Sequence, residues 1–381
     1  MIGASLTSRI NVGVLAVALA WPIGLYSAGW KAETLMATFP STLFLTLLGV
    51  TLLFGVAQAN GTMSAITSAA VRLCRGRASL LPFAFFALAL VVSSSGPGAI
   101  ATTALLAPLA MGIGSRAGLP VLLTALMVGN GANAGNLSPI SPVGVLVNTL
   151  METAGMGGHS VAVWAANFVA HSFAAAIAWM LFGGIALLRS TRVVELMPQA
   201  SSDGWTRAHR TTLAVCLLWI ASVVLLGANP GLSAFAAASV LVLLRAGDDG
   251  AMLKSVPWNV LVMVCGVSVL VGVLDKTGGM DLFTSMLAAI SSTRTVNGTV
   301  ALVTGLLSTY SSTSGVVYPA FLPAVPGLVA KLGGGNLLEI ALSINVGAAV
   351  VDVSPLSTIG ALLVSILSTI LSAVFVKDDD D

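Results

Sequence analysis

The stretch Asn136-Leu137-Ser138-Pro139-Ile140-Ser141-Pro142-Val143-Gly144 recurs further along the chain as Asp352-Val353-Ser354-Pro355-Leu356-Ser357-Thr358-Ile359-Gly360. The shift between the copies is 352 − 136 = 216 residues. Both copies lie inside apolar sequence, where polar residues and prolines have no packing reason to cluster. A second match, Gly49–Val56 against Gly266–Val273, has a shift of 266 − 49 = 217. Two matches at nearly one shift predict an internal duplication.

The composition predicts an integral membrane protein. Charged residues make up only 8% of the 381-residue chain and apolar residues 57%, whereas a soluble domain carries about 25% charged residues. The apolar runs are long enough to cross a bilayer as helices of about 20 residues, and they lack the strict alternation of a barrel strand. The predicted fold class is therefore an all-α polytopic membrane protein. No basic cluster suits a nucleic acid, and the three cysteines have no metal-binding spacing.

The apolar pattern predicts about eight transmembrane crossings. They lie near 10–28, 36–57, 119–150, 160–188, 211–227, 231–246, 256–274 and 336–376. Two shorter segments, 60–77 and 278–292, are predicted to lie at the membrane interface. Two further stretches, 79–115 and 294–332, are each too long for one span and are interrupted by a Ser/Gly-rich cluster. We expect each to form a re-entrant hairpin, because non-helical backbone at that depth must be buried in protein or line a cavity.

The orientation follows from the loop 189–210, which carries Arg189, Arg192, Arg207 and Arg210. The positive-inside rule places this loop in the cytoplasm, and eight crossings then place both termini there. Arg72, Arg75 and Arg77 fall on the same side. The two copies of the duplicated unit run in opposite directions through the membrane, which predicts inverted repeats with a binding site near the bilayer midplane.

The duplicated segments are predicted breaks in the third and eighth crossings. Proline removes a backbone donor and clashes with the preceding turn, so Pro139, Pro142 and Pro355 unwind the helix. Unwinding frees carbonyls that can bind a cation and opens a helix N-terminus that favours an anion. A proline kink with internally bonded serines is the alternative for either copy alone. The candidate substrate ligands at the breaks are Ser138, Pro139, Ser141, Ser354, Pro355, Ser357 and Thr358.

The hairpin tips supply the other candidate substrate ligands, because small hydroxyl residues with glycine let N–H groups and hydroxyls converge on an oxygen-rich ligand. Small residues also serve close helix packing, which is the alternative interpretation. The candidates are Ser94, Ser95 and Gly96 at the first tip and Ser312, Thr313, Ser314 and Gly315 at the second.

Asp352 is the sharpest single candidate, because an intramembrane carboxylate is costly and indicates function by default. It could bind a cation, carry a proton or cap the following half-helix. Its counterpart is Asn136, so the two copies are chemically unequal. We expect one cation site at Asn136 with Ser94 and the hairpin tip, and another at Asp352 with Ser314 and the second tip. Asn133 and Asn345 flank the breaks and are further candidate cation ligands.

Together these residues resemble the ion transporter superfamily. The nearest branch is similar to divalent-anion/sodium symporters, and within it to bacterial dicarboxylate carriers of the malonate-carrier type. The resemblance covers about 36–155 and 256–370 and is most specific at 136–141, 352–357 and the two hairpins. It implies a homodimer with a scaffold and a mobile transport domain, an elevator mechanism, and substrate held between hairpin tips and broken helices.

The domain organisation that the resemblance implies assigns the hairpins and broken helices to the transport domain. The expected boundaries are 1–78 for the first scaffold helices, 79–155 for the first hairpin and broken helix, 156–230 for connecting helices, 231–293 for the second scaffold helices, 294–376 for the second hairpin and broken helix, and 377–381 for an acidic tail.

The predicted function is secondary active transport of a small organic dianion, such as malonate or a C4-dicarboxylate, by Na⁺ symport across the inner membrane. No cofactor other than the coupling ion is expected, and no catalytic motif indicates an enzyme. One departure matters: symporters of this kind carry Ser-Asn-Thr at each tip, whereas the tips here read Ser-Ser-Ser-Gly and Ser-Thr-Ser-Gly. Proton coupling, a proton antiporter and an anion channel or uniporter therefore stay open.

Overall fold

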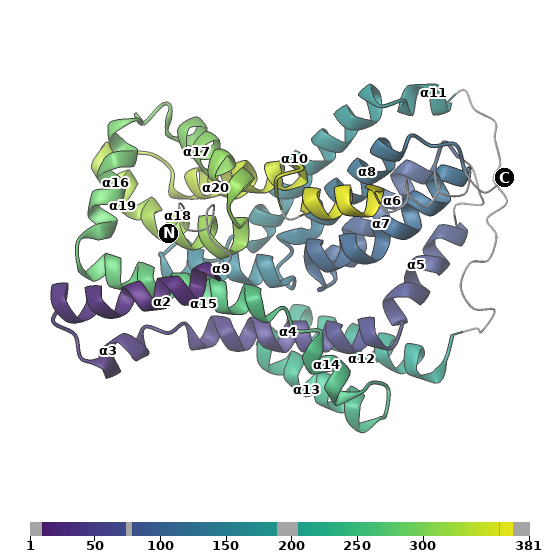
Figure 1. Ribbon diagram of the computed structural model, residues 1–381, viewed down its shortest axis with the longest axis horizontal. Helices are drawn as coiled ribbons and strands as arrows, with labels where there is room; N and C mark the ends of the chain where they lie inside the picture. Colours follow the sequence, from purple (N-terminus) through teal and green to yellow (C-terminus); the bar gives the residue numbers. More distant parts are fainter. Residues whose placement is uncertain (1–9, 74–77, 189–204, 358, 369–381) are drawn as a thin grey trace. The chain divides into compact units, whose positions relative to one another are not determined.

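The computed structural model describes residues 10–73, 78–188, 205–357 and 359–368. Every regular element in these ranges is a helix, as predicted. Figure 1 labels the helices along the chain, which divides into two compact units. Unit 1 comprises Met1–Leu48, Val143–Ala166 and Pro257–Asp352, and unit 2 comprises Gly49–Pro142, Asn167–Val256 and Val353–Asp381.

In unit 1, α2 (Val12–Pro22) packs along α15 (Trp258–Lys276). A Cβ on Gly13 would overlap the carbonyl oxygen of Val262, and one on Gly266 would overlap that of Gly13. Only glycine therefore allows the two backbones to approach so closely, as is common where membrane helices cross. Pro22 ends the regular α2, and the chain continues as a π-helix over Ile23–Ser27 because proline lacks the donor of a helical bond.

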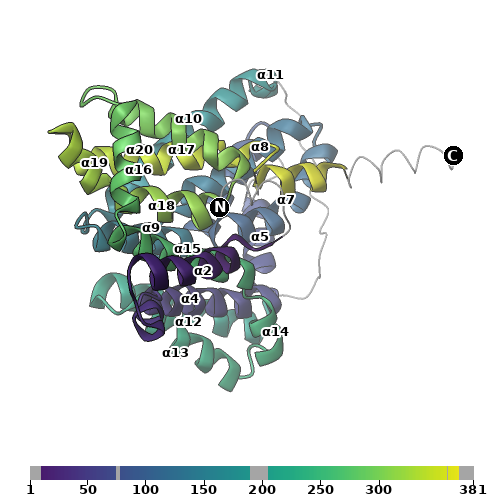
Figure 2. The ribbon, with the colours of Figure 1, turned by 60° about the vertical axis from the view of Figure 1, so that its left-hand side comes forward.

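The second hairpin also lies in unit 1. Its first arm is α17 (Val296–Tyr310), and its second arm runs from Thr313 to Leu332. The second arm consists of a π-helix η2 (Thr313–Val317), α18 (Tyr318–Phe321), a 3-10 turn η3 (Leu322–Ala324) and α19 (Val325–Leu332). Figure 2 shows α17 beside α20 (Leu337–Val350), and α16 (Gly279–Ala289) beside α19.

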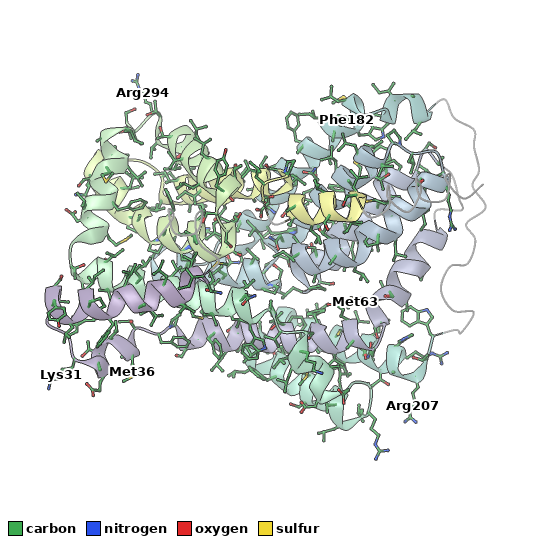
Figure 3. All side chains as sticks on the ribbon, viewed as in Figure 1. Lys31, Met36, Met63, Phe182, Arg207 and Arg294 are labelled. Atoms are coloured by element: carbon green, nitrogen blue, oxygen red, sulfur yellow. The ribbon has the colours of Figure 1, made fainter. Side chains whose placement is uncertain are left out.

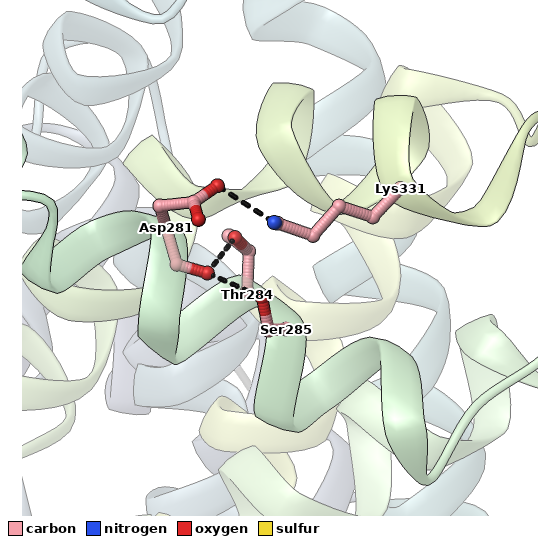
Figure 4. A network of polar contacts seen from close by, with 4 residues as sticks. All are labelled: Asp281, Thr284, Ser285 and Lys331. Carbon is pink, nitrogen blue, oxygen red and sulfur yellow. Dashed lines mark hydrogen bonds and ion pairs between the residues drawn. The ribbon is translucent and has the colours of Figure 1, made fainter.

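One ion pair joins α16 to α19. The Lys331 Nζ lies 2.6 Å from the Asp281 Oδ1. The hydroxyls of Thr284 and Ser285 donate to the backbone carbonyl of Asp281, at 3.0 and 2.8 Å. Figure 4 shows these contacts at the start of α16. The interfacial segment predicted at 278–292 is thus tied to the second hairpin.

In unit 2, the first hairpin consists of α6 (Leu81–Ser94) and α7 (Gly98–Arg116), and both arms pack on α8 (Val121–Asn136). Gly131 and Gly135 of α8 lie against the carbonyls of Phe86 and Leu90. A side chain on Gly135 would also lie 2.7 Å from the Ser94 hydroxyl oxygen. These glycines hold the broken helix against the hairpin.

The C-terminal half of α4 (Ser41–Ala59) also lies in unit 2, where α4 meets α13 (Pro230–Leu243). A Cβ on Gly49 of α4 would overlap the carbonyl oxygen of Gly231 in α13. The other elements of the chain are α3 (Ala32–Ala37), α5 (Thr62–Leu73), α9 (Pro142–Thr153), α10 (Ser160–Leu181), α11 (Gly184–Leu188), α12 (Arg207–Leu226), α14 (Asp249–Lys254), the 3-10 turn η4 (Val351–Val353) and an apolar helix Ile359–Ser368.

Helices of the first half recur in the second half in the same order. The elements α2, α3, α4 and α5 have counterparts in α13, α14, α15 and α16. Their close contacts are reciprocal: Gly13 contacts Gly266, and their counterparts Gly231 and Gly49 contact one another. Asn11 and Asn229 each cap the first helix of a half. This pattern supports the duplication, while the inverted orientation stays a prediction.

Several predicted boundaries are wrong, each for a local reason. The span predicted from 36 begins only at Ser41, after the separate helix α3. The loop predicted over 189–210 ends at Thr206, because Thr206 and His209 form a capping box that starts α12. The span predicted over 160–188 divides at Gly183, whose φ of 95° is left-handed.

Among the described residues, five helices are long and apolar enough to cross a membrane by themselves, and they support the prediction of an integral membrane protein. They are Ser41–Ala59, Gly98–Arg116, Ser160–Leu181, Trp258–Lys276 and Thr313–Leu332. The charged side chains of Lys31, Arg207 and Arg294 point away from the helices near them (Figure 3). The predicted arginines at 75, 77, 189 and 192 and the acidic tail lie outside the described residues.

Candidate functional site

The first hairpin turns over three residues, Ser95, Gly96 and Pro97. Gly96 has a φ of 143° and Gly98 one of 74°, conformations that favour glycine. The Ser95 hydroxyl donates to the Val92 carbonyl at 2.8 Å. The hydroxyls of Ser93 and Ser94 are buried and have no hydrogen-bond partner among the described residues. The Ser94 hydroxyl thus stays a candidate donor and acceptor for a ligand.

The first helix break lies between α8 and α9 and is bonded to the first hairpin. The Asn136 Oδ1 accepts from the backbone N–H of Ala99 at 3.0 Å. The Ser138 hydroxyl donates to the carbonyl of Ser94 at 2.7 Å. The Ser141 hydroxyl bonds the carbonyls of Asn136 and Ser138. We call Ser94, Ala99, Asn136 and Ser138 half-site 1.

The second helix break follows α20, where η4 and a turn over 354–357 precede the helix Ile359–Ser368. The Ser357 hydroxyl donates to the Ser354 carbonyl at 2.8 Å, as Ser141 does to Ser138 in the first copy. The backbone N–H of Gly360 lies 3.3 Å from the Ser357 hydroxyl oxygen. Thr358, a predicted ligand, lies outside the described residues.

Asp352 connects the second break to the second hairpin. The Thr313 hydroxyl donates to the Asp352 Oδ1 at 2.8 Å, and the Ser308 hydroxyl forms a short hydrogen bond with that of Thr313. The Ser312 hydroxyl accepts from the backbone N–H of Gly315 at 3.0 Å. We call Ser308, Thr313 and Asp352 half-site 2. In both copies the Asn or Asp of the break thus accepts a hydrogen bond from the second arm of its own hairpin.

Comparison with known proteins points to one class of transporter. Residues 1–136 match the family model of the dicarboxylate carrier protein MatC N-terminus. The chain is similar in structure to the YdaH transporter of Alcanivorax borkumensis, with a TM-score of 0.62 and 17% sequence identity over 93% of this chain and 90% of that one. No curated protein matches the chain.

Over its first 136 residues, the chain is similar to the dicarboxylate carrier family. The predicted resemblance is confirmed to that extent. The likeness to YdaH shows that the two chains share a fold over most of their length. The carrier is a membrane transporter, and both comparisons are with transporters rather than enzymes.

Two predicted cation ligands of the carrier lie apart from the half-site hydrogen bonds. Asn133 is fully buried, and within the described part of the chain neither its Oδ1 nor its Nδ2 has a hydrogen-bond partner. Asn345 directs its Nδ2 to the Met151 Sδ at 3.8 Å, while its Oδ1 has no partner. A buried polar atom without a partner needs an explanation, such as a water or an ion, so both amide oxygens stay candidates.

The sequence did not identify two contributors to the half-sites, Ala99 and Ser308. The Ala99 N–H is a backbone donor, which no side-chain pattern reveals. Ser308 looks like any helical serine, yet it bonds Thr313. Outside the half-sites, the Nδ1 of His171 lies 3.1 Å from the Asn130 Oδ1. The opposite ring nitrogen of His171 has no partner in the described residues.

Proposed function

We propose that the carrier is a secondary active transporter that moves a small organic dianion, such as malonate or a C4-dicarboxylate, by an elevator mechanism driven by Na⁺. The observation that carries the proposal is the matched pair of half-sites. Each joins a hairpin tip to a helix break through an Asn or Asp acceptor.

Electrostatics support cation coupling. The hairpin and break segments 79–115, 119–150 and 336–376 contain no Lys or Arg, and the second hairpin (294–332) carries only Arg294 and Lys331, near its two ends. A dianion must therefore be stabilised by hydroxyls, amides and helix N-termini, such as that of α9. One helix end contributes about 0.3–1 kcal/mol when exposed and up to about 2 kcal/mol when partly buried. That is too little for two desolvated carboxylates, so co-bound cations supply the remaining charge.

The half-sites are suited to different cations. Asn136 offers a neutral oxygen that is already held by the Ala99 N–H. Asp352 offers a carboxylate of which one oxygen is held by Thr313. A carboxylate in the membrane binds a cation or a proton far more readily than an amide does. We therefore assign Asp352 the main coupling ion, with a proton as the alternative to Na⁺.

Uptake into proteoliposomes tests the function. Purified carrier is reconstituted, and entry of radiolabelled malonate or succinate is followed under an inward Na⁺ gradient, an inward H⁺ gradient or neither. Accumulation above equilibrium under the Na⁺ gradient is the expected result. Accumulation only under the H⁺ gradient would indicate the proton-coupled alternative. Saturation only at very high substrate, without accumulation, would indicate a channel or uniporter.

The resemblance also leads us to propose a homodimer in the inner membrane with both termini in the cytoplasm. The division into a scaffold and a transport domain belongs to the same proposal. The mass of the reconstituted assembly and the accessibility of engineered cysteines from either side check these points.

A further inference from the structure

The tip of the first hairpin lies against an aromatic ring. A Cβ added to Gly96 would overlap the ring of Phe54, which belongs to α4. Real Cβ atoms are essentially never found closer than 3.0 Å to another heavy atom. The glycine therefore lets the backbone of the tip touch the ring directly. The contact is buried, since Phe54 is only 5% exposed.

The Phe54 ring is itself held in place. It packs edge-on against Trp219 of α12, with ring centroids 5.7 Å apart and an interplanar angle of 77°. Trp219 is 3% exposed, and its indole N–H donates to the carbonyl of Pro230 at 3.2 Å. An aromatic side chain with two torsions, fixed by a second ring, forms a rigid surface. The tip thus contacts the fixed Phe54 ring, which belongs to α4 and is packed against α12, outside the hairpin.

The tip of the second hairpin has the same arrangement with a different side chain. A Cβ on Gly315 would lie 2.6 Å from the Met263 Sδ and 2.7 Å from its Cγ. Met263 belongs to α15 and packs on the core that α15 forms with α2. The Gly315 backbone does not have a positive φ. Its lack of a side chain is explained by the contact with Met263 and not by backbone conformation.

Each tip is thus held between an apolar contact and a polar one. Gly96 touches Phe54, while the neighbouring Ser94 carbonyl accepts from Ser138 of the break. Gly315 touches Met263, while the neighbouring Thr313 donates to Asp352. Hydrogen bonds fix the tip to its break, and the glycine contact determines how far the tip advances. A shift at either glycine would displace the half-site beside it.

We propose that Phe54 and Met263 are positioning residues that determine where the two hairpin tips rest and thereby the affinity for the transported anion. The proposal rests on the proposed function for its effect on affinity, but the tip positions can be measured without it. Neither side chain needs to touch the anion.

Gly315 provides the first test, because a methyl group added there should clash with Met263, and shortening Met263 should remove the clash. In the proteoliposome assay, Gly315→Ala should raise KM about tenfold, the scale expected when a methyl group overpacks a filled contact, with a smaller change in Vmax. Met263→Ala in the same chain should bring KM back toward the wild-type value. The matched control is Gly298→Ala in the same hairpin, where nothing lies within 4 Å of the added Cβ.

Phe54 provides the second test, with a readout that does not require transport. The three native cysteines are replaced by serine, and a cysteine is introduced at Ser95 or, for the second tip, at Ser314. The rate of labelling by a maleimide reports the position of the tip in the full-length reconstituted carrier. Phe54→Ala should change the rate at the first tip by about tenfold, since it removes the fixed surface, and leave the second tip unchanged. Phe54→Leu serves if the alanine variant does not fold.

The outcomes separate the two proposals. Three results would each overturn the positioning role. They are an unchanged KM in Gly315→Ala, a KM that does not recover when Met263→Ala is added, and a labelling rate at position 95 that is the same with and without Phe54→Ala. If no dicarboxylate is transported but Phe54→Ala still changes the labelling rate at the first hairpin tip, the positioning role stands and the proposed function fails. Thermal unfolding of every variant shows that it is folded before its kinetics are compared.

Discussion

At the residue scale, the two copies differ most at Asn136 and Asp352, which have nearly the same shape. Both accept one hydrogen bond from the second arm of a hairpin, from the Ala99 N–H in one copy and the Thr313 hydroxyl in the other. An amide oxygen and a carboxylate oxygen accept equally well in geometry. The difference that remains is a full negative charge, which concentrates any cation binding at Asp352.

Replacing Asp352 by Asn should therefore separate charge from shape. The amide keeps an oxygen for Thr313, so the fold around the tip is retained, but the charge that favours a cation is lost. We expect the concentration of Na⁺ that half-saturates uptake to rise by at least about tenfold, or 1.4 kcal/mol. Uptake measured against external Na⁺ at fixed substrate checks this.

Asn136→Asp is the matched control for that substitution, since it adds a charge at the equivalent position. It should not reproduce the loss of Na⁺ affinity. An Asp352→Asn carrier with wild-type Na⁺ dependence but no response to a proton gradient would instead assign the carboxylate to proton transfer.

Single residues could be predicted where a polar group stood out against apolar sequence. Asn136, Asp352, Ser94 and Thr313 were singled out in this way. In the structure, Thr313 donates to Asp352, Asn136 accepts from the Ala99 N–H, and the Ser94 carbonyl accepts from Ser138. Backbone donors such as the Ala99 N–H carry no sequence signal. The contact between Gly96 and Phe54 was also invisible, because a glycine in a turn is explained equally well by its positive φ.

At the element scale, the two helix breaks arise from short polar sequences with proline. The α8 helix ends at Asn136 and α9 begins at Pro142, where a missing N–H costs nothing. Pro139 lies in the turn between them. Its ring prevents the turn from becoming helical, which keeps Ser138 free to bond the Ser94 carbonyl.

Pro139→Ala should let the helix extend into the break. The substitution restores a backbone donor and removes the ring clash that costs about 3 kcal/mol in a helix. We expect substrate affinity to fall about tenfold or 1.4 kcal/mol, while thermal stability stays equal or rises. Pro108→Ala is the control, because Pro108 lies inside the regular helix α7, and its replacement should leave KM unchanged. A Pro139→Ala carrier with normal affinity would show that the break does not depend on this proline.

The ion pair between Asp281 and Lys331 should contribute little despite its short distance. The Asp281 side chain is 75% exposed and that of Lys331 is 28% exposed, and such pairs contribute about 0–1 kcal/mol. We expect Lys331→Ala to shift Tm no more than Lys276→Ala does, since Lys276 has no ion pair in the described residues. A much larger shift, abolished by Asp281→Ala, would show that the pair holds α16 to the second hairpin.

Long elements could be predicted from their apolar runs, and short or irregular ones could not. Helices of six residues such as α3 and α14 are too short to show a period. The irregular second arm of the second hairpin follows from Pro319, Pro323 and Pro326, each of which removes a helical donor. Proline predicts such irregularity but does not determine whether a π-helix or a 3-10 turn results.

At the scale of the whole molecule, the repeat is visible in contacts as well as in sequence. Gly55 lies against Ser255, and its counterpart Gly272 lies against Thr38, the counterpart of Ser255. In each pair a residue of one half meets a helix of the other half. Such an exchange is expected when two copies of one unit fold together around a pseudo-two-fold axis.

The orientation of the two copies can be tested with one pair of residues. Lys31 and Asp248 differ by 248 − 31 = 217 positions, and each precedes the short helix of its half, α3 or α14. Both side chains are exposed.

If the repeats are inverted, these equivalent positions face opposite sides of the membrane. With the native cysteines replaced by serine, Lys31→Cys should react with an impermeant maleimide added outside intact cells. Asp248→Cys should react only after permeabilisation, as should Arg207→Cys on the predicted cytoplasmic side. Labelling of Lys31→Cys and Asp248→Cys from the same side would show that the copies are parallel, and the half-sites could then not be related by an axis in the membrane plane.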